Sequence, residues 1–239
     1  MPSHNVRPRV LAFDVFGTVV DWHGSILQYM AEHYPHVDGD AFACAWRSAY
    51  QPAMERVRNG SQAWTSLDVL HRQILDGLLP QFALEHLDES QRQSLNKIWQ
   101  QLDAWPESAA ALGRLKPHFI LTSLSNGNMA LLTLLSKHNL LPWDCLLSAE
   151  VFHAYKPDPA VYSGAVSMFG LQPQEVMLVA AHHDDLAAAR ACGLQTAYIE
   201  RPQEWGALHI KDVSPRTDND MHCRNLMDFA QQIMTRHAI

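Results

Sequence analysis

Four groups of polar residues that could take part in chemistry follow short apolar runs of the chain. The first is Asp14, which ends the apolar run of LAFDVFGTVVDW at residues 11–22. An ionised carboxylate at the mouth of a buried strand is costly to desolvate, so Asp14 is expected either to be paired or to be used chemically. The other groups are Ser125-Asn126-Gly127, Lys156 in AYKPDP, and Asp185 in AAHHDDLAAA. Together they offer a nucleophile, a cation and a second carboxylate.

Each group alone also has an ordinary structural interpretation. Asp14 could be an acid in a turn, and Lys156 could be an exposed cation in a loop. Residues 125–127 form a favourable turn or helix cap, and Asp184 is favoured as the N-cap of a helix. The four groups differ from such features because all of them fall in order at the same edge of the predicted sheet.

The elements that must position these groups are strands and helices in alternation. Apolar runs predict strands at residues 9–14, 118–125, 176–181 and 196–199, and helical patterns lie between the later runs. This alternation predicts an α/β fold with a Rossmann-like, doubly wound parallel sheet. Because the crevice of an open parallel sheet lies beyond the carboxyl ends of its strands, the four groups are expected to meet there.

The interval between the first two strands is too long for a single crossover. It contains amphipathic segments with a period of 3.6 residues, which predict roughly four helices, at residues 25–34, 40–58, 64–79 and 88–102. We therefore expect a core of residues 1–20 and 101–239, with a helical cap of residues 21–100 inserted after the first strand. A last amphipathic segment, residues 224–234, is expected to pack against the core.

Composition excludes several classes of protein. The chain of 239 residues carries a net charge of −7 and has no cluster of Lys and Arg, so nucleic acid is not an expected partner. Its first ten residues lack the pattern of a signal peptide, and no apolar run approaches the ~18 residues of a membrane span. We expect a cytoplasmic protein without membrane contact. The four cysteines show no C-x-x-C spacing and are interpreted as small buried hydrophobes.

In their order along the chain, these motifs resemble the haloacid dehalogenase superfamily. The motifs are D-x-F-G-T from Asp14, S-N-G from Ser125, K-P-D-P from Lys156, and a strand leading to D-L-A-A-A from Asp185. The resemblance implies a Rossmann-like core with a helical cap over the active site, and Asp14 as the nucleophile.

Most members of that superfamily are magnesium-dependent phosphatases, which carry a second acid two residues after the nucleophile and another after the fourth motif's strand. Here Phe16 and the pair Ala180-Ala181 hold those positions. A hard cation needs oxygen ligands, so no metal and no other cofactor is expected.

A cation in the cap segment CAWRSAYQPAM selects a branch of the superfamily. Arg47 follows Trp46, as a similar arginine does in type II (S)-2-haloacid dehalogenases. With Arg47, the charges of Asp14, Lys156 and Asp185 sum to zero, which leaves room for one substrate that bears a carboxylate. The resemblance implies hydrolysis of short 2-haloalkanoic acids, such as haloacetate or (S)-2-chloropropionate, to 2-hydroxy acids through an ester on Asp14. It also allows a homodimer.

The resemblance implies a role for each catalytic residue. Lys156 would keep Asp14 ionised, because a nearby cation favours the charged carboxylate. Asp185 would position or activate the hydrolytic water. Thr18 and the backbone after Gly17 would hydrogen-bond Asp14 and stabilise the oxyanion of the second step.

The same resemblance assigns residues that bind the substrate. Ser125 and the neighbouring amides would bind its carboxylate, while Arg47 and Asn126 would receive the departing halide. An apolar wall that excludes water is expected from Phe16, Trp64 and Tyr162.

One motif departs from the family pattern. In well-studied members the fourth motif is similar to S-S-N-A-W-D, whereas this chain has AAHHDD at residues 180–185. His182, in place of the asparagine, is either a donor to halide or water, acting in its neutral form above pH ~6.5, or a structural histidine. Fluoroacetate is a candidate substrate, because Arg47, Asn126 and His182 could donate several hydrogen bonds to a small halide. A phosphatase and a non-catalytic binding protein are the rival interpretations.

Overall fold

The fold is known from a computed structural model, which describes residues 6–239; residues 1–5 of the predicted core segment lie outside this range. Its centre is a six-stranded, fully parallel sheet with the order β3-β2-β1-β4-β5-β6. The strands are β1 (Val10–Phe13), β2 (Ile120–Ser125), β3 (Cys145–Ser148), β4 (Val176–Ala180), β5 (Gln195–Ile199) and β6 (Met221–Cys223).

The α/β class and four of the strands agree with the sequence-based predictions. The runs at 9–14, 118–125, 176–181 and 196–199 correspond to β1, β2, β4 and β5. The two edge strands, β3 and β6, were not predicted. The first two residues of β3 are only partly buried, and β6 has three residues with a histidine at its centre, so neither has the fully apolar character by which β1, which also has four residues, stands out.

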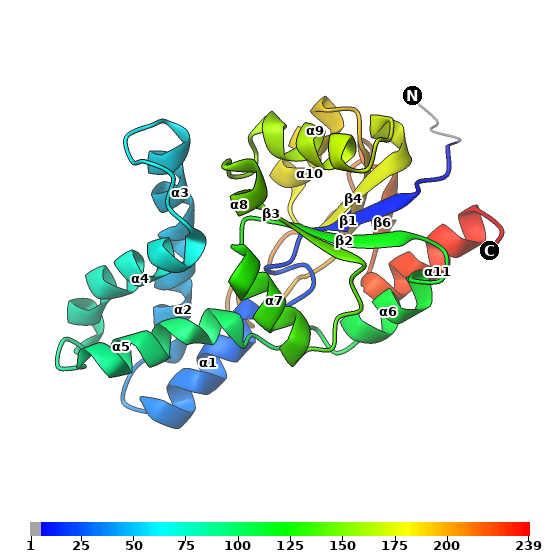
Figure 1. Ribbon diagram of the computed structural model, residues 1–239. Helices are drawn as coiled ribbons and strands as arrows, with labels where there is room; N and C mark the ends of the chain where they lie inside the picture. The colour runs from blue at the N-terminus through cyan, green and yellow to red at the C-terminus, as the bar shows by residue number, and fades with distance from the viewer. Residues whose placement is uncertain (1–5) are drawn as a thin grey trace.

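Helices cover both faces of the sheet (Figure 1). One face packs against α6 (Ser108–Leu115), α7 (Met129–His138) and α11 (Leu226–Arg236). The other packs against α8 (Ala149–Phe152), α9 (Pro159–Met168) and α10 (His183–Ala191). Side chains of β1 alternate between these layers: Leu11 and Phe13 belong to the first hydrophobic cluster, Val10 and Ala12 to the second. The final helix packs against the core, as its periodicity predicts.

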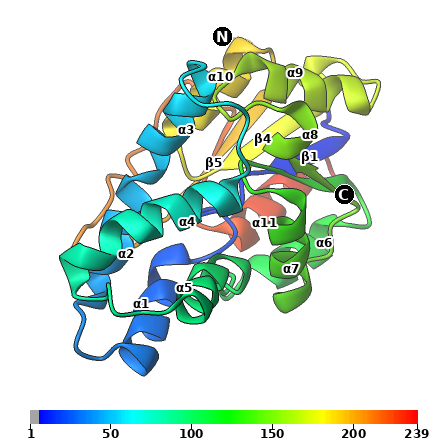
Figure 2. The same ribbon diagram turned by 60° about the vertical axis from the view of Figure 1, so that its left-hand side comes forward.

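A group of helices between β1 and β2 lies beside the sheet (Figure 2). It contains α1 (Trp22–His33), α2 (Gly39–Ser48), α3 (Tyr50–Arg58), α4 (Leu67–Leu78) and α5 (Glu89–Asn96), with short 3₁₀ turns η1 (Leu79–Phe82) and η2 (Lys97–Gln100). We call this group the helical lobe. Its buried aromatic side chains, among them Trp46 and Trp99, belong to the same hydrophobic cluster as the first face of the sheet.

The segment 40–58 forms two helices rather than the one that its periodicity predicts. The chain turns at Ala49, between α2 and α3. Pro52 explains the break, because it has no N–H with which to continue the hydrogen-bond ladder to Ser48. The turn has a consequence for the site described below, since Arg47 and Tyr50 flank it.

The interpretation of all cysteines as buried hydrophobes is wrong for three of the four. All four thiols are free, but Cys44, Cys145 and Cys192 are partly exposed and only Cys223 is buried.

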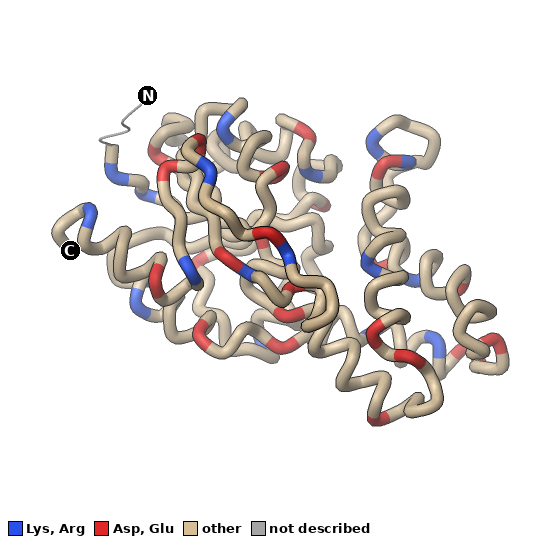
Figure 3. Tube along the Cα trace, turned by 180° about the vertical axis from the view of Figure 1, so that it is seen from behind, with Lys and Arg blue, Asp and Glu red and all other residues tan. Residues whose placement is uncertain are grey.

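Basic and acidic residues are interspersed along the trace (Figure 3). Within residues 6–239, no helix combines the length and apolar character that a membrane crossing requires.

Candidate active site

Asp14 is held at the carboxyl end of β1 by a tight turn. Gly17 adopts φ +83°, a conformation that glycine enters without strain. The turn returns Thr18 to the aspartate, where its hydroxyl donates to Asp14 Oδ2 at 2.7 Å and accepts from the Ala181 amide at 2.9 Å. Thr18 therefore ties the end of β1 to the end of β4, and the Asp14 carboxylate is fixed in orientation.

Lys156 joins the two aspartates of the site. Its ammonium donates to Asp14 Oδ1 at 2.9 Å and to Asp185 Oδ2 at 2.5 Å. The other oxygen of Asp185 accepts from the Tyr162 hydroxyl at 2.6 Å, and Asn126 Oδ1 accepts from the Lys156 amide at 2.8 Å. All five side chains are less than one-tenth exposed. The structure thus brings together residues from the ends of β1 and β2, from the segment after α8, and from α9 and α10.

Burial and charge divide the two aspartates. Burial alone would raise the pKa of Asp14, but Lys156 and His182 outweigh it and hold that pKa well below its ordinary value. Burial also raises the pKa of Asp185, and the neighbouring Asp14 charge adds to this effect. Asp14 is therefore the carboxylate that is ionised at every physiological pH, as a nucleophile must be.

His182 lies between two carboxylates. Its Nδ1 is 3.1 Å from Asp14 Oδ2, and its Nε2 is 2.8 Å from Glu204 Oε1. Burial lowers the pKa of His182, but Glu204 and Asp14 outweigh burial and raise it to about 9. The resting imidazole is consequently protonated at neutral pH, which corrects the sequence-based expectation of a neutral donor.

Glu204 is the functional residue that sequence reasoning missed. It is 1% exposed, and its second oxygen accepts from Lys211 Nζ at 2.6 Å. The turn at Gly17 approaches it so closely that a Cβ there would lie 2.3 Å from Glu204 Oε1. A signal was available, because Glu204 follows β5 just as the other groups follow their strands.

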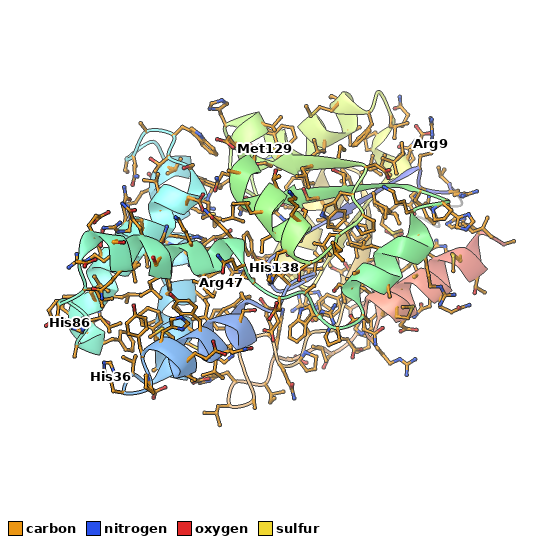
Figure 4. All side chains as sticks on the ribbon, turned by 60° about the horizontal axis from the view of Figure 1, so that its bottom comes forward. Arg9, His36, Arg47, His86, Met129 and His138 are labelled. Atoms are coloured by element: carbon orange, nitrogen blue, oxygen red, sulfur yellow. The ribbon has the colours of Figure 1, made fainter. Side chains whose placement is uncertain are left out.

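The polar groups open into a small cavity of about 70 Å³. It is lined by Asp14, Phe16, Arg47, Tyr50, Gln51, Asn126, Lys156, Pro157, Tyr162, His182, Asp184 and Asp185. Arg47 reaches it from the helical lobe, on the side that faces the core (Figure 4). Its guanidinium lies 4.5 Å from the Tyr50 ring centroid, and Nη1 is buried with no hydrogen-bond partner among residues 6–239. A buried cationic donor without a partner is suited to an anion.

Some predicted residues lie elsewhere or act differently. Ser125 does not line the cavity; its hydroxyl is buried and accepts from the Gly127 amide at 3.2 Å. Trp64 is also absent from the lining and packs on Tyr155, with ring centroids 4.9 Å apart. Tyr162 is more than an apolar wall, because its hydroxyl binds Asp185.

The residues beside His182 also differ from expectation or lie apart from the cavity. The N-cap of α10 is His182 rather than Asp184, which lies exposed in the first turn. His183 stacks on Tyr198 with ring centroids 4.1 Å apart.

The charges of the site favour a monoanionic ligand. Around the cavity, the cations Arg47, Lys156, His182 and Lys211 face the buried carboxylates Asp14, Asp185 and Glu204. Four positive charges against three leave an excess of one in the interior of the site, and the exposed Asp184 at the rim brings the sum for these eight groups to zero.

The donors do not fit Mg²⁺. The Phe16 ring and the Ala180 and Ala181 methyl groups offer no oxygen, and Lys156 already bridges the two aspartates.

Comparison with known proteins identifies the family. The model of the haloacid dehalogenase-like hydrolases matches residues 8–193. (S)-2-Haloacid dehalogenase 4A of Burkholderia cepacia is 31% identical over 218 residues, which cover 85% of this chain and 89% of that protein. A solved L-2-haloacid dehalogenase is 44% identical and superposes with a TM-score of 0.91, covering 95% of this chain and 99% of its own. A solved defluorinating L-2-haloacid dehalogenase is 39% identical, with a TM-score of 0.91 and 97% of each chain covered.

The chain therefore belongs to the haloacid dehalogenase-like hydrolases. Within them, it falls in the branch of the (S)-2-haloacid dehalogenases, to which the relative at 31% identity belongs. The family resemblance of the motifs is confirmed.

Raising the pH is expected to remove the contribution of His182 to stability. Its folded-state pKa of about 9 exceeds the ordinary 6.5, so a contribution of roughly 3 kcal/mol is complete below pH 6.5 and is lost as the pH rises through 9. Urea unfolding of wild type and His182→Gln at about pH 6 and about pH 10 measures it. The difference in unfolding free energy between the two proteins should shrink at the higher pH.

His183→Gln is the matched control, because burial and nearby cations lower the pKa of His183. Its difference from wild type should not shrink at the higher pH, because a lowered pKa makes the contribution of the neutral ring complete only above pH 6.5. A difference for His182→Gln that does not shrink either would show that His182 is not held protonated.

Proposed function

We propose that the protein hydrolyses the carbon–halogen bond of short 2-haloalkanoic acids, yielding 2-hydroxy acids through an ester on Asp14. One observation carries the proposal: an ionised, oriented Asp14 faces the unpartnered donor of Arg47 across a small cavity, and the excess positive charge beside it is offset only at the exposed rim. A short acid matches the volume, and its carboxylate matches the charge. The helical lobe, residues 21–100 of the predicted cap, supplies Arg47 and Tyr50.

In the first step, an oxygen of Asp14 bonds to the substrate Cα from the face opposite the halogen. The carbon–halogen bond breaks, and halide leaves with the bonding electrons toward Arg47 and Asn126, so that Cα is inverted. Phe16 excludes water from this side of the cavity. Lys156 keeps Asp14 ionised and oriented, because it favours the charged carboxylate.

In the second step, water attacks the ester carbonyl carbon, and we assign its activation to His182. Esterification removes the charge of Asp14, so His182 loses one of the two anions that raise its pKa and releases its proton to solvent. The free Nδ1 then accepts a proton from water, with Glu204 orienting the ring through Nε2. Collapse of the tetrahedral intermediate gives this proton to the departing oxygen of the 2-hydroxy acid. The proton left on the Asp14 carboxyl then passes to His182, which restores the ionised aspartate and the protonated imidazole.

Asp185 is less available for this role than the sequence suggests. Both of its oxygens already accept hydrogen bonds, from Lys156 and Tyr162. We infer that Asp185 positions Lys156. Thr18 hydrogen-bonds Asp14 and so helps to stabilise the oxyanion of the second step.

The rival functions have less support. A phosphatase would need an acid where Phe16 lies and oxygen ligands where Ala180 and Ala181 lie. A non-catalytic binding protein would have no use for an aspartate that is held ionised among three donors. A homodimer and a cytoplasmic location remain predictions from the sequence.

The ester mechanism predicts the source of the product oxygen. In a single turnover of (S)-2-chloropropionate in H₂¹⁸O with excess EDTA, the product hydroxyl should be unlabelled and Asp14 should gain the label. The reason is that the hydroxyl oxygen comes from Asp14 and water attacks the carbonyl carbon. Mass spectrometry of the product and of the Asp14 peptide measures both.

Asp14→Asn is the control and should release no halide. Label in the product hydroxyl would mean direct attack by water. If the wild-type protein releases no halide and hydrolyses phosphate esters with magnesium, the result would support the phosphatase instead.

His182→Asn is expected to separate the two steps. Without the base, the first step should still release about one halide per enzyme, while turnover falls by about 10²–10⁴ and the ester accumulates. Intact-protein mass spectrometry should detect Asp14 carrying the substrate acid. Asp185→Asn should instead slow this first release of halide, because Lys156 loses its ion pair with Asp185 and is less well positioned beside Asp14. A slow burst with no ester in His182→Asn would show that His182 serves the first step.

Fluoroacetate is expected to be a substrate as well. Fluoride is small and leaves poorly, so its departure depends on strong donors, which Arg47 and Asn126 supply. One solved relative is described as defluorinating. A fluoride electrode should detect release from fluoroacetate, and Arg47→Lys should impair this more than chloride release from chloroacetate. Turnover of chloroacetate without any fluoride release from fluoroacetate would exclude this substrate.

A further inference from the structure

A cluster of metal-ligating side chains lies outside the active-site cavity. His23, Asp40 and Cys44 each offer one ligand atom, and these atoms all lie within 4.8 Å of one another. None of the three lines the cavity that contains Asp14. The mechanism above assigns no task to them.

The helices of the lobe produce this cluster by simple geometry. Asp40 and Cys44 are four residues apart on α2, so their side chains share one face of the helix. His23 comes from α1, and its Nε2 is 2.9 Å from Asp40 Oδ1. The His23 ring is held against Gly206, where an added Cβ would lie 2.4 Å from the ring. The imidazole is 3% exposed and cannot turn away freely.

A fourth donor comes from the core. His209 lies on the segment after β5, and its Nε2 is 3.8 Å from Asp40 Oδ2. Its side chain is 59% exposed, so it can adjust its position. A neighbouring hollow of about 350 Å³, lined by His23, Asp40 and Gly206 among others, opens the group to solvent.

We propose that His23, Asp40, Cys44 and His209 form a binding site for a zinc-like divalent cation. Two imidazoles, a thiolate and a carboxylate are donors typical of Zn²⁺, whereas Mg²⁺ and Ca²⁺ prefer oxygen alone. Tetrahedral zinc with bonds of about 2.0–2.3 Å separates its ligand atoms by roughly 3.3–3.7 Å, so the observed spacing needs only small shifts. Binding replaces the thiol proton of Cys44, which leaves to solvent.

The position of the site gives it a structural effect. Three ligands belong to the helical lobe and His209 to the core, so a bound cation joins the two. Cys44 lies three residues before Arg47 on α2, and His209 lies five residues after Glu204. The cation therefore lies outside the active-site cavity but fixes the two segments that carry Arg47 and Glu204.

Cobalt provides a direct test on the full-length protein after treatment with a chelator. Titration with Co²⁺ should produce a thiolate-to-cobalt charge-transfer band that saturates at one equivalent and is bleached by Zn²⁺. The band reports on cysteine alone, so binding to others of the 14 histidines does not imitate it. Zn²⁺ should also raise Tm by about 5 °C, because it binds only the folded chain.

Variants assign the ligands. Cys44→Ala should abolish the band, while Cys192→Ala, which removes another partly exposed thiol, should keep it. Asp40→Asn and His209→Ala should retain the band but need at least tenfold more Co²⁺ to reach it. Circular dichroism checks that each variant is folded.

No band in wild type, or a band that persists in Cys44→Ala, would overturn the site. Halide release in EDTA is measured separately, so this result leaves the dehalogenase proposal untouched.

Discussion

The buried ammonium of Lys156 is the interaction on which the site depends. It lies between the carboxylates of Asp14 and Asp185, 142 residues and 29 residues away along the chain. At 4 Å and an effective dielectric of 20, each attraction contributes about 4 kcal/mol. Without the lysine, two like charges would face each other in a buried site, which is strongly unfavourable. The sheet order must therefore bring the ends of β1 and β4 and the segment after α8 to one point.

The shared lysine also makes the two aspartates unequal. Asp14 has further donors in Thr18 and His182, and its pKa falls. Asp185 accepts from Tyr162 besides the lysine, but burial and the neighbouring charge of Asp14 raise its pKa. The same ion pair thus produces one carboxylate suited to attack and another suited to support. This division follows from the charges around each carboxylate, since Asp14 faces the cation of His182 as well as Lys156, whereas Asp185 faces the anion of Asp14.

Much of this could be predicted from the sequence, and the rest could not for physical reasons. Asp14, Lys156 and Asp185 follow buried strands or their connections, and the parallel topology brings such residues together. Pro52 marked the break between α2 and α3, although the apolar period concealed it. Glu204 lies in the segment 200–211, which has no periodicity; its position after β5 is a weak signal, and the close approach of Gly17 in the structure shows where it lies.

The protonation of His182 could not be predicted from the sequence either, because it depends on the position of Glu204. Ser125, predicted to bind the substrate carboxylate, and Trp64, predicted to form an apolar wall, do not line the cavity for another reason. A position near a strand end or in the cap determines the neighbourhood of a side chain but not the direction in which it points.

The backbone of Ala181 connects Thr18 with the charged groups around His182. Its amide donates to Thr18, and its carbonyl accepts from Lys211 Nζ at 2.5 Å. Lys211 also binds Glu204, which in turn holds His182. His182 lies against Asp14, and Thr18 donates to the same aspartate oxygen. Two routes of hydrogen bonds and ion pairs thus lead from one peptide group to Asp14, which fixes the carboxylate from both sides.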